Sequence, residues 1–214
     1  MSKFSTRCWK RLVPLGLAAS VAAVMLVPAP AEATPYIVKL VQQGNNVVAT
    51  GSGTFDLAGL TLVGATVTGP AALQPSDGYV MTGPLSNVAI DSYTGYVGPT
   101  SFGSGNNFIS SDVGTGDTVG IFGSSTYYGY PNFWVPSGYV SGGALSGTST
   151  YDNASFTTLG VTPGTYVWTW GGGADQSFTL DIVTAGVPEP AALGMFGLGV
   201  LLIGAFVGLR RRTA

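Results

Sequence analysis

The amino-acid sequence predicts an all-β chain: a single β-sandwich or jelly-roll-like domain over residues 34–186, flanked by an N-terminal signal peptide and a C-terminal transmembrane helix. Three observations predict this organisation. Short β-branched or aromatic runs are separated by Gly, Asn, Pro or Asp, no helical periodicity extends over ten residues between 34 and 186, and an apolar segment lies at each end. About 150 residues suits one domain with a sizeable core.

Residues 1–33 have the order of a secretory signal peptide. A basic stretch that ends at Arg11 is followed by the apolar run Leu12–Val27 and then by the small residues Ala31 and Ala33. We expect signal peptidase to cut after Ala33, so that the mature chain starts at Thr34, with cleavage after Ala31 as the alternative. We favour a transmembrane anchor less, because the run is short and interrupted by a proline and a glycine.

Six stretches in the first half of the domain have the composition of short strands. They are residues 36–41, 46–50, 53–57, 60–69, 78–82 and 87–91. Gly44, Asn45 and Asn46 tolerate positive φ, so we expect a hairpin between the first two.

The clearest hairpin closes the domain. Residues 165–170 and 176–183 are joined by 171–175, which begins with three glycines. Large apolar side chains occupy alternate positions in both segments, so each strand has one apolar face. About a dozen short strands in about 150 residues favour a sandwich or a jelly roll.

Between residues 95 and 143 this regular pattern gives way to Gly, Ser, Asn and Tyr, and we expect long irregular loops there. Aromatic residues gather in the same region. Tyr128, Tyr130 and Trp134 are candidate sugar contacts, because exposed rings can stack on sugar rings. The favoured alternative is that these rings fill or cover the core.

The charge and side-chain inventory of the domain exclude several classes of function. One lysine, Lys39, and eight aspartates give residues 34–186 a formal charge of −7, which argues against binding to nucleic acid. The same range contains no His, Cys, Arg or Glu. Neither a Ser-His-Asp arrangement nor a metal site with His or Cys ligands can be built, so we expect no enzyme, no cofactor and no metal.

The aspartates leave two alternatives open. Paired aspartates act in glycosidases, and the stretch from Asp112 to Asp117 places two carboxylates in a loop with two glycines, a ligand type that suits Ca²⁺. Most of the aspartates lie beside Gly, Ser or Asn, so turn formation is the favoured explanation.

Ala191–Leu209 is a run of 19 uncharged, mostly apolar residues. As a helix this run spans about 28 Å, close to the thickness of the hydrocarbon core of a bilayer. Arg210, Arg211 and Arg212 are expected to stay on the cytoplasmic side. The segment therefore predicts a single-pass helix with the acidic domain on the other side of the membrane.

An ordinary anchor does not explain the four residues before this run, which are Val187, Pro188, Glu189 and Pro190. A Pro-Glu-Pro triplet, a short apolar span and terminal arginines, in this order, resemble the PEP-CTERM sorting signal of exported bacterial proteins. The resemblance implies that an exosortase-like transpeptidase recognises the triplet and cuts near it, while the arginines hold the helix until cleavage. It also implies a Gram-negative host that makes exopolysaccharide, a transient anchor in the inner membrane, and a final location at the cell surface or in the extracellular matrix.

A similar tail also carries the label ice-binding protein C-terminal domain, which describes the tail alone. Ice binding needs a flat array of regularly spaced threonines, and the stretch Thr66, Val67, Thr68 is too isolated to form one.

We therefore expect an exported, non-enzymatic protein of the cell surface or matrix, linked to exopolysaccharide or biofilm. The alternative is a carbohydrate-binding module displayed at the cell surface. The expected partners are signal peptidase, an exosortase-like transpeptidase, the membrane through the C-terminal helix, and exopolysaccharide.

Overall fold

The computed structural model describes residues 34–124, 129 and 131–184. In these ranges the chain forms thirteen β-strands in two sheets, with one 3-10 turn and one four-residue α-helix, so the expected all-β fold is confirmed. No helix within the described ranges is long and apolar enough to cross a membrane. The expected signal peptide 1–33 and transmembrane helix 191–209 lie outside the described residues, and the domain boundaries stay predictions.

The first sheet contains six strands. In spatial order they are β12 (Gly164–Thr169), β13 (Ser177–Val183), β1 (Tyr36–Gln43), β2 (Asn46–Gly53), β11 (Leu145–Tyr151) and β8 (Val113–Gly116). The neighbours β1 and β13 run parallel, and the other neighbouring pairs are antiparallel.

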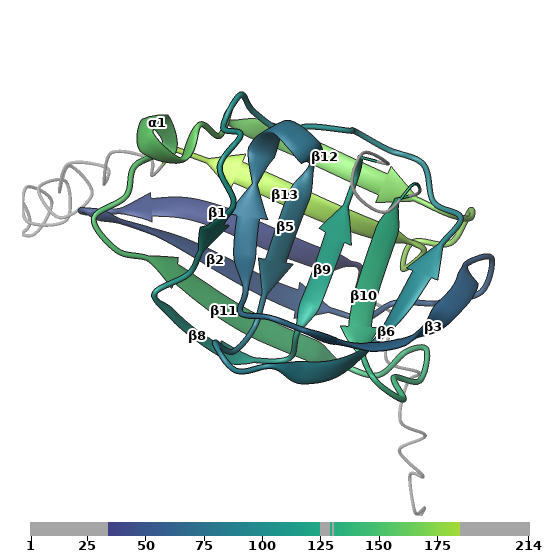
Figure 1. The fold of residues 1–214 in the computed structure, drawn as a ribbon. Coiled ribbons are helices and arrows are strands. Elements are labelled where there is room, and N and C mark those ends of the chain that lie inside the picture. The colour runs from purple at the N-terminus through teal and green to yellow at the C-terminus, as the bar shows by residue number, and fades with distance from the viewer. Residues whose placement is uncertain (1–33, 125–128, 130, 185–214) are drawn as a thin grey trace, which may run out of the picture. The chain divides into compact units, whose positions relative to one another are not determined.

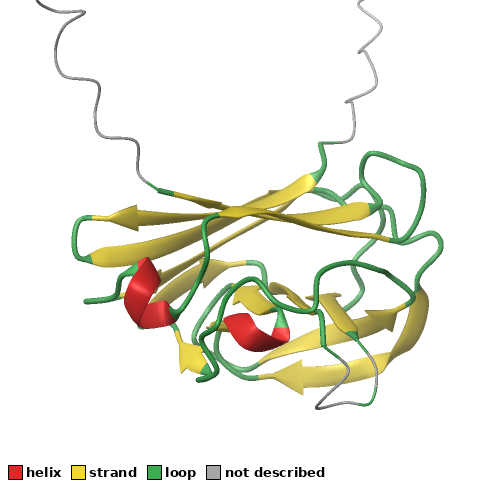
Figure 2. Cartoon of the chain, turned by 90° about the horizontal axis from the view of Figure 1, so that it is seen from above, coloured by secondary structure: helices red, strands yellow, loops and turns green. Residues whose placement is uncertain are grey.

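The second sheet contains seven strands, all paired antiparallel. In spatial order they are β3 (Thr61–Thr68), β6 (Val88–Thr94), β10 (Asn132–Pro136), β9 (Val119–Phe122), β5 (Tyr79–Thr82), β4 (Ala72–Gln74) and β7 (Ile109–Ser110). The turn η1 (Pro75–Asp77) joins β4 to β5, and the helix α1 (Phe156–Leu159) precedes β12. The second sheet lies in front of the first in Figure 1, and Figure 2 shows the two sheets as stacked layers.

Both predicted hairpins are present. Gly44 has φ 61° in the turn between β1 and β2, a conformation that glycine adopts without steric cost. The last two strands pair from Gly164 with Ile182 to Thr169 with Ser177.

Two local expectations are wrong. Residues 54–57 do not continue as a strand after β2, although Phe55 is fully buried. Residues 109–122 and 132–136 carry four strands where we expected irregular loops, while 95–108 and 137–143 lie outside the named strands, as expected. The strands β9 and β10 are buried on both faces, so they lack the alternation that identifies a half-exposed strand.

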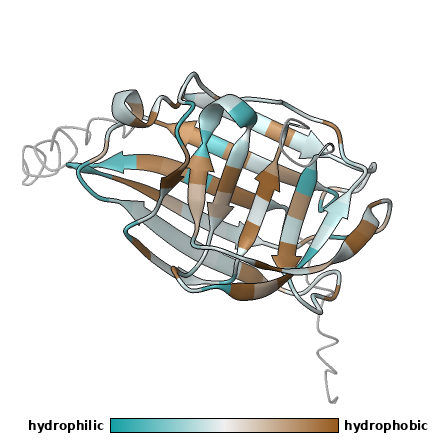
Figure 3. Cartoon of the chain, viewed as in Figure 1, coloured by the Kyte–Doolittle hydropathy of each residue, from teal (hydrophilic) through white to brown (hydrophobic). Residues whose placement is uncertain are grey.

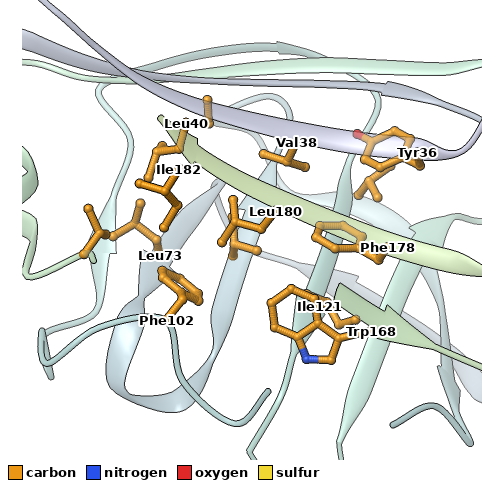
Figure 4. Packing of buried hydrophobic residues seen from close by; sticks show 14 of the residues in the cluster. Tyr36, Val38, Leu40, Leu73, Phe102, Ile121, Trp168, Phe178, Leu180 and Ile182 are labelled. Carbon is orange, nitrogen blue, oxygen red and sulfur yellow. The ribbon is translucent and has the colours of Figure 1, made fainter. Parts of the chain in front are cut away.

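The main core lies between the sheets. Side chains of β1 and β13, among them Val38, Leu40 and Leu180, point toward Leu73 and Ile121 of the second sheet (Figure 4). The strictly alternating burial of β13 follows from its period-two sequence. The predicted hairpin thus supplies one portion of the first sheet's part of this core, and β1, β2 and β11 supply the rest.

Three tyrosines lie in the main core, and burial raises the pKa of each hydroxyl above its usual range. Tyr36 Oη and Thr82 Oγ1 share a hydrogen bond of 3.3 Å, and Tyr96 Oη donates to the carbonyl oxygen of Phe122 at 2.8 Å. Tyr151 Oη finds no hydrogen-bond partner among the described residues. All three tyrosines therefore stay neutral well above pH 7.

Candidate functional site

The outer face of the second sheet, the face turned away from the first sheet, carries a second hydrophobic cluster. Its buried members are Ala72, Tyr79, Met81, Ile90, Phe122 and Trp134. Brown segments recur along β9, β10 and β3 in Figure 3, whereas β11 of the first sheet is mostly pale. Because Phe133 and Val135 enter the main core, Trp134 between them lies in this second cluster.

The strand register sets how the cluster packs. Trp134 pairs with Ser92 on one side and with Gly120 on the other, and Gly120 pairs with Met81. A Cβ atom at Gly120 would lie 3.0 Å from Cβ of Met81, so the absence of a side chain there makes room for its neighbours. A larger residue at this position would crowd Met81.

The second sheet curves strongly at its β3 edge. Thr68 Oγ1 of β3 donates to Met81 Sδ of β5 at 3.4 Å, although β6, β10 and β9 lie between these strands in the sheet. On a flat sheet the two strands would be about 19 Å apart, at about 4.8 Å per strand. A register shift between Leu62 and Gly64, where Gly64 has φ 155°, is a bulge-like irregularity of the kind that bends a strand.

This curvature leaves a hollow of about 430 Å³ on the outer face. Residues 63–69, most of them in β3, form one wall of the hollow. Met81, Ile90 and Trp134 belong to its lining and to the buried cluster, so they form the floor. Phe108, which precedes β7, also lines it. We call this feature the outer hollow.

Aromatic rings follow one another from the rim of the outer hollow to its floor. The ring centroids of Phe108 and Tyr79 are 5.2 Å apart, and those of Tyr79 and Trp134 are 5.7 Å apart. Phe108 is 55% exposed and Trp134 is 5% exposed. Phe108 therefore offers the open ring face, whereas Trp134 supports the floor.

Two polar side chains interrupt this apolar floor. Ser92 Oγ donates to Asn132 Oδ1 at 2.8 Å, and both residues are buried and line the outer hollow. The hydrogen bond orients the amide of Asn132. The lining contains no Asp, Glu, Lys or Arg among the described residues, so its recognition chemistry consists of rings, hydroxyls and an amide.

Of the three candidate sugar contacts, the structure places Trp134 in the outer hollow, while Tyr128 and Tyr130 lie outside the described residues. Sequence reasoning missed Tyr79, Ser92 and Phe108, which come from separate parts of the chain. The consecutive apolar residues at 79–81 are the sequence signal that could have identified Tyr79, since a strand without alternation is typically covered on both faces.

The other predicted sites fall largely outside the described residues. These are Ala31, Ala33, Val187, Pro188, Glu189, Pro190, Arg210, Arg211 and Arg212. Thr34, the predicted first residue of the mature chain, is exposed, and its carbonyl oxygen accepts from the amide of Thr54 at 2.8 Å.

Asp112 and Asp117 lie at opposite ends of β8. Asp112 Oδ2 accepts from the backbone amide of Asp152 at 2.8 Å, and Asp117 Oδ2 accepts from that of Ser146 at 2.9 Å. These contacts hold one oxygen of each carboxylate, and the stretch between the two aspartates is the strand β8, so the expected loop there is wrong. Among the described residues there is no group of three or more His, Cys, Asp or Glu that could hold a metal ion.

Comparisons with known proteins place the C-terminal segment in a family. A search of curated proteins and a search of solved structures each returned no match to this chain. Residues 186–212 match the model of the PEP-CTERM protein-sorting motif. Exosortases recognise this motif, which implies export and a surface or extracellular location. The triplet and the arginines lie within this match, so the chain carries a C-terminal segment that matches the PEP-CTERM protein-sorting motif.

Proposed function

We propose that this chain is a non-enzymatic protein that is delivered through the exosortase route and works at the cell surface or in the extracellular matrix, in association with exopolysaccharide. The match of residues 186–212 to the sorting motif carries this proposal. A domain with a charge of −7 next to that motif suits an aqueous location outside the cell.

The contacts of the aspartates support a non-enzymatic role. Asp91 accepts from Ser137 Oγ at 3.0 Å and from the amide of Gly138 at 2.8 Å, which holds the turn after β10. Asp56 accepts from the amide of Ala58 two residues later and from Gln176 Nε2. Carboxylates used in this way organise loops and are not paired as general acid and base.

Mass spectrometry of the exported protein, combined with cell fractionation, tests the delivery route. We expect the mature chain to begin at Thr34, to lack Arg210–Arg212, and to appear in the surface or matrix fraction. Glu189→Ala should retain the full tail in the membrane fraction, whereas Asp77→Ala, which removes an acidic side chain from the domain, should be processed normally. Recovery of Arg212 in the wild-type surface protein would leave a permanent single-pass anchor as the better explanation.

The outer hollow favours a second candidate function, a carbohydrate-binding module displayed at the cell surface. A concave site with aromatic rings and a few oriented polar groups is typical of small-ligand binding. Titration of the purified exported protein with the exopolysaccharide of its host separates the two candidates. Saturable binding supports the module, and the absence of binding supports a structural role in the matrix.

A further inference from the structure

We propose that the outer hollow binds a segment of a neutral polysaccharide. One sugar ring of the segment lies against Phe108, and hydroxyl groups of the segment form hydrogen bonds with Ser92 and Asn132. This inference rests on the proposed carbohydrate-binding function and assigns it a site and a ligand class. It concerns only residues that the structure describes.

The size of the outer hollow suits a short oligosaccharide segment. Its volume of about 430 Å³ lies in the range of ligand pockets, about 300–1,000 Å³. The floor is preformed, because Met81, Ile90 and Trp134 are buried members of a packed cluster. Little conformational entropy is therefore lost when a ligand settles on it.

The chemistry of the lining matches a sugar better than a purely apolar ligand. A pyranose ring has an apolar face of C–H groups and a rim of hydroxyls, so it needs both a ring to stack on and polar atoms nearby. Phe108 presents the open aromatic face, and its position is supported by Tyr79 behind it. Ser92 Oγ, which donates to Asn132, keeps its acceptor lone pairs for a ligand hydroxyl.

The charge distribution selects a neutral sugar over an acidic one. The lining has no cationic side chain to pair with a carboxylate, sulfate or phosphate group. Lys39, the one basic residue in the range 34–184, pairs in register with Asp181 and Thr50 on the first sheet. The charge of −7 on the domain further disfavours an anionic chain.

Isothermal titration calorimetry of the purified exported protein tests this assignment. The probes are neutral oligosaccharides of glucose and of mannose, and oligouronates of the same length. We expect saturable binding of a neutral series and binding of the oligouronates that is at least about tenfold weaker, the change that separates two ligands by about 1.4 kcal/mol.

Two variants locate the binding site. Phe108→Ala should weaken binding about fivefold, since it removes one aromatic contact from a residue that is already half exposed. Thr66→Trp should abolish binding, because Thr66 is exposed on the wall of the outer hollow and a large ring there would occupy it. Val113→Ala is the matched control, since Val113 is 53% exposed on the edge of the first sheet, and it should bind like the wild type. Circular dichroism checks that each variant is folded.

Each outcome separates the site from the wider proposal. If a neutral saccharide binds equally well to the wild type, Phe108→Ala and Thr66→Trp, the site is wrong but carbohydrate binding stands. A preference for oligouronates overturns the neutral ligand class. If no saccharide binds to the wild type, the site and the carbohydrate-binding candidate both fail, while the delivery route is decided separately by the C-terminal mass.

Discussion

The outer face of the first sheet carries a row of polar side chains, whereas the outer face of the second sheet carries a hydrophobic cluster around a hollow. The polar row crosses the first sheet in register. Its members are Thr165, Asp181, Lys39, Thr50, Thr148 and Thr115. Two pairs in the row are hydrogen-bonded side chain to side chain, Thr165 with Asp181 and Thr115 with Thr148. The corresponding face of the second sheet buries Trp134 and Ile90.

This difference shows that the two sheets obey different patterns. The strands β1 and β13 of the first sheet alternate between buried and more exposed residues, so that one face is buried and the other is solvated. The central strands of the second sheet have covered side chains on both faces. The first sheet's outer face is therefore exposed to solvent, whereas the second sheet's outer face is a second core that contains the outer hollow.

The largest effect on stability is expected from replacing Trp134, the largest side chain of the outer cluster. Trp134→Ala is expected to lower the free energy of unfolding by about 3–5 kcal/mol, because it leaves a cavity among buried rings. Val167→Ala, at an exposed position on the outer side of β12, should change it by no more than about 0.5 kcal/mol. Urea unfolding measures both. Equal effects would mean that the outer cluster is not a core.

One hydrogen-bonded side-chain pair on each outer face tests the same difference at a smaller energy: Ser92 with Asn132 on the second sheet and Thr115 with Thr148 on the first. Ser92→Ala should cost about 1–3 kcal/mol of stability, because it removes the buried hydroxyl that donates to Asn132 Oδ1. Thr148→Ala should cost about 0.5 kcal/mol or less, because its bond with Thr115 is exposed to water, which replaces it. Chemical denaturation of both variants is the measurement. A larger loss for Thr148→Ala would contradict the assignment of the two faces.

Between the sheets, one substitution is expected to cause no loss of stability at neutral pH. Tyr151→Phe should leave stability unchanged or raise it by about 1 kcal/mol, because the hydroxyl is buried with no partner among the described residues. Burial raises the pKa of Tyr151. The unfolded chain therefore ionises near pH 10 while the folded chain does not, and the stability falls as the pH rises above about 10.

Unfolding at pH 8 and at pH 11 should therefore show a smaller alkaline loss of stability in Tyr151→Phe than in the wild type. An unchanged alkaline loss would show that the Tyr151 hydroxyl reaches water in the folded protein.

The same contrast explains how much of the fold can be predicted from the sequence. Tyr166, Trp168 and Phe178 lie in strands that alternate strictly, so the last hairpin was predicted almost to the residue. In β10 the neighbours Phe133 and Trp134 are both buried, one on each face of the sheet. Burial on both faces removes the period-two signal, and the segment resembles an irregular aromatic loop.

The outer hollow could be predicted only in part. The aromatic residue Trp134 marked the right region, but the ring that stays open belongs to Phe108, and the supporting ring belongs to Tyr79. These residues meet through the strand register and through the bend at Gly64 of β3. Pairings across such distances depend on the whole sheet, which no local pattern encodes.

The parallel pairing of β1 with β13 has a mechanical consequence. Six residue pairs join these strands, from Tyr36 with Phe178 to Val41 with Val183. Because the strands point the same way, the chain enters the domain beside one end of this ladder and leaves it beside the other. A pull on the two ends of the domain acts along the ladder and loads its hydrogen bonds together, in shear. The bonds share the force and do not open one at a time, as they would in a hairpin pulled from its open end.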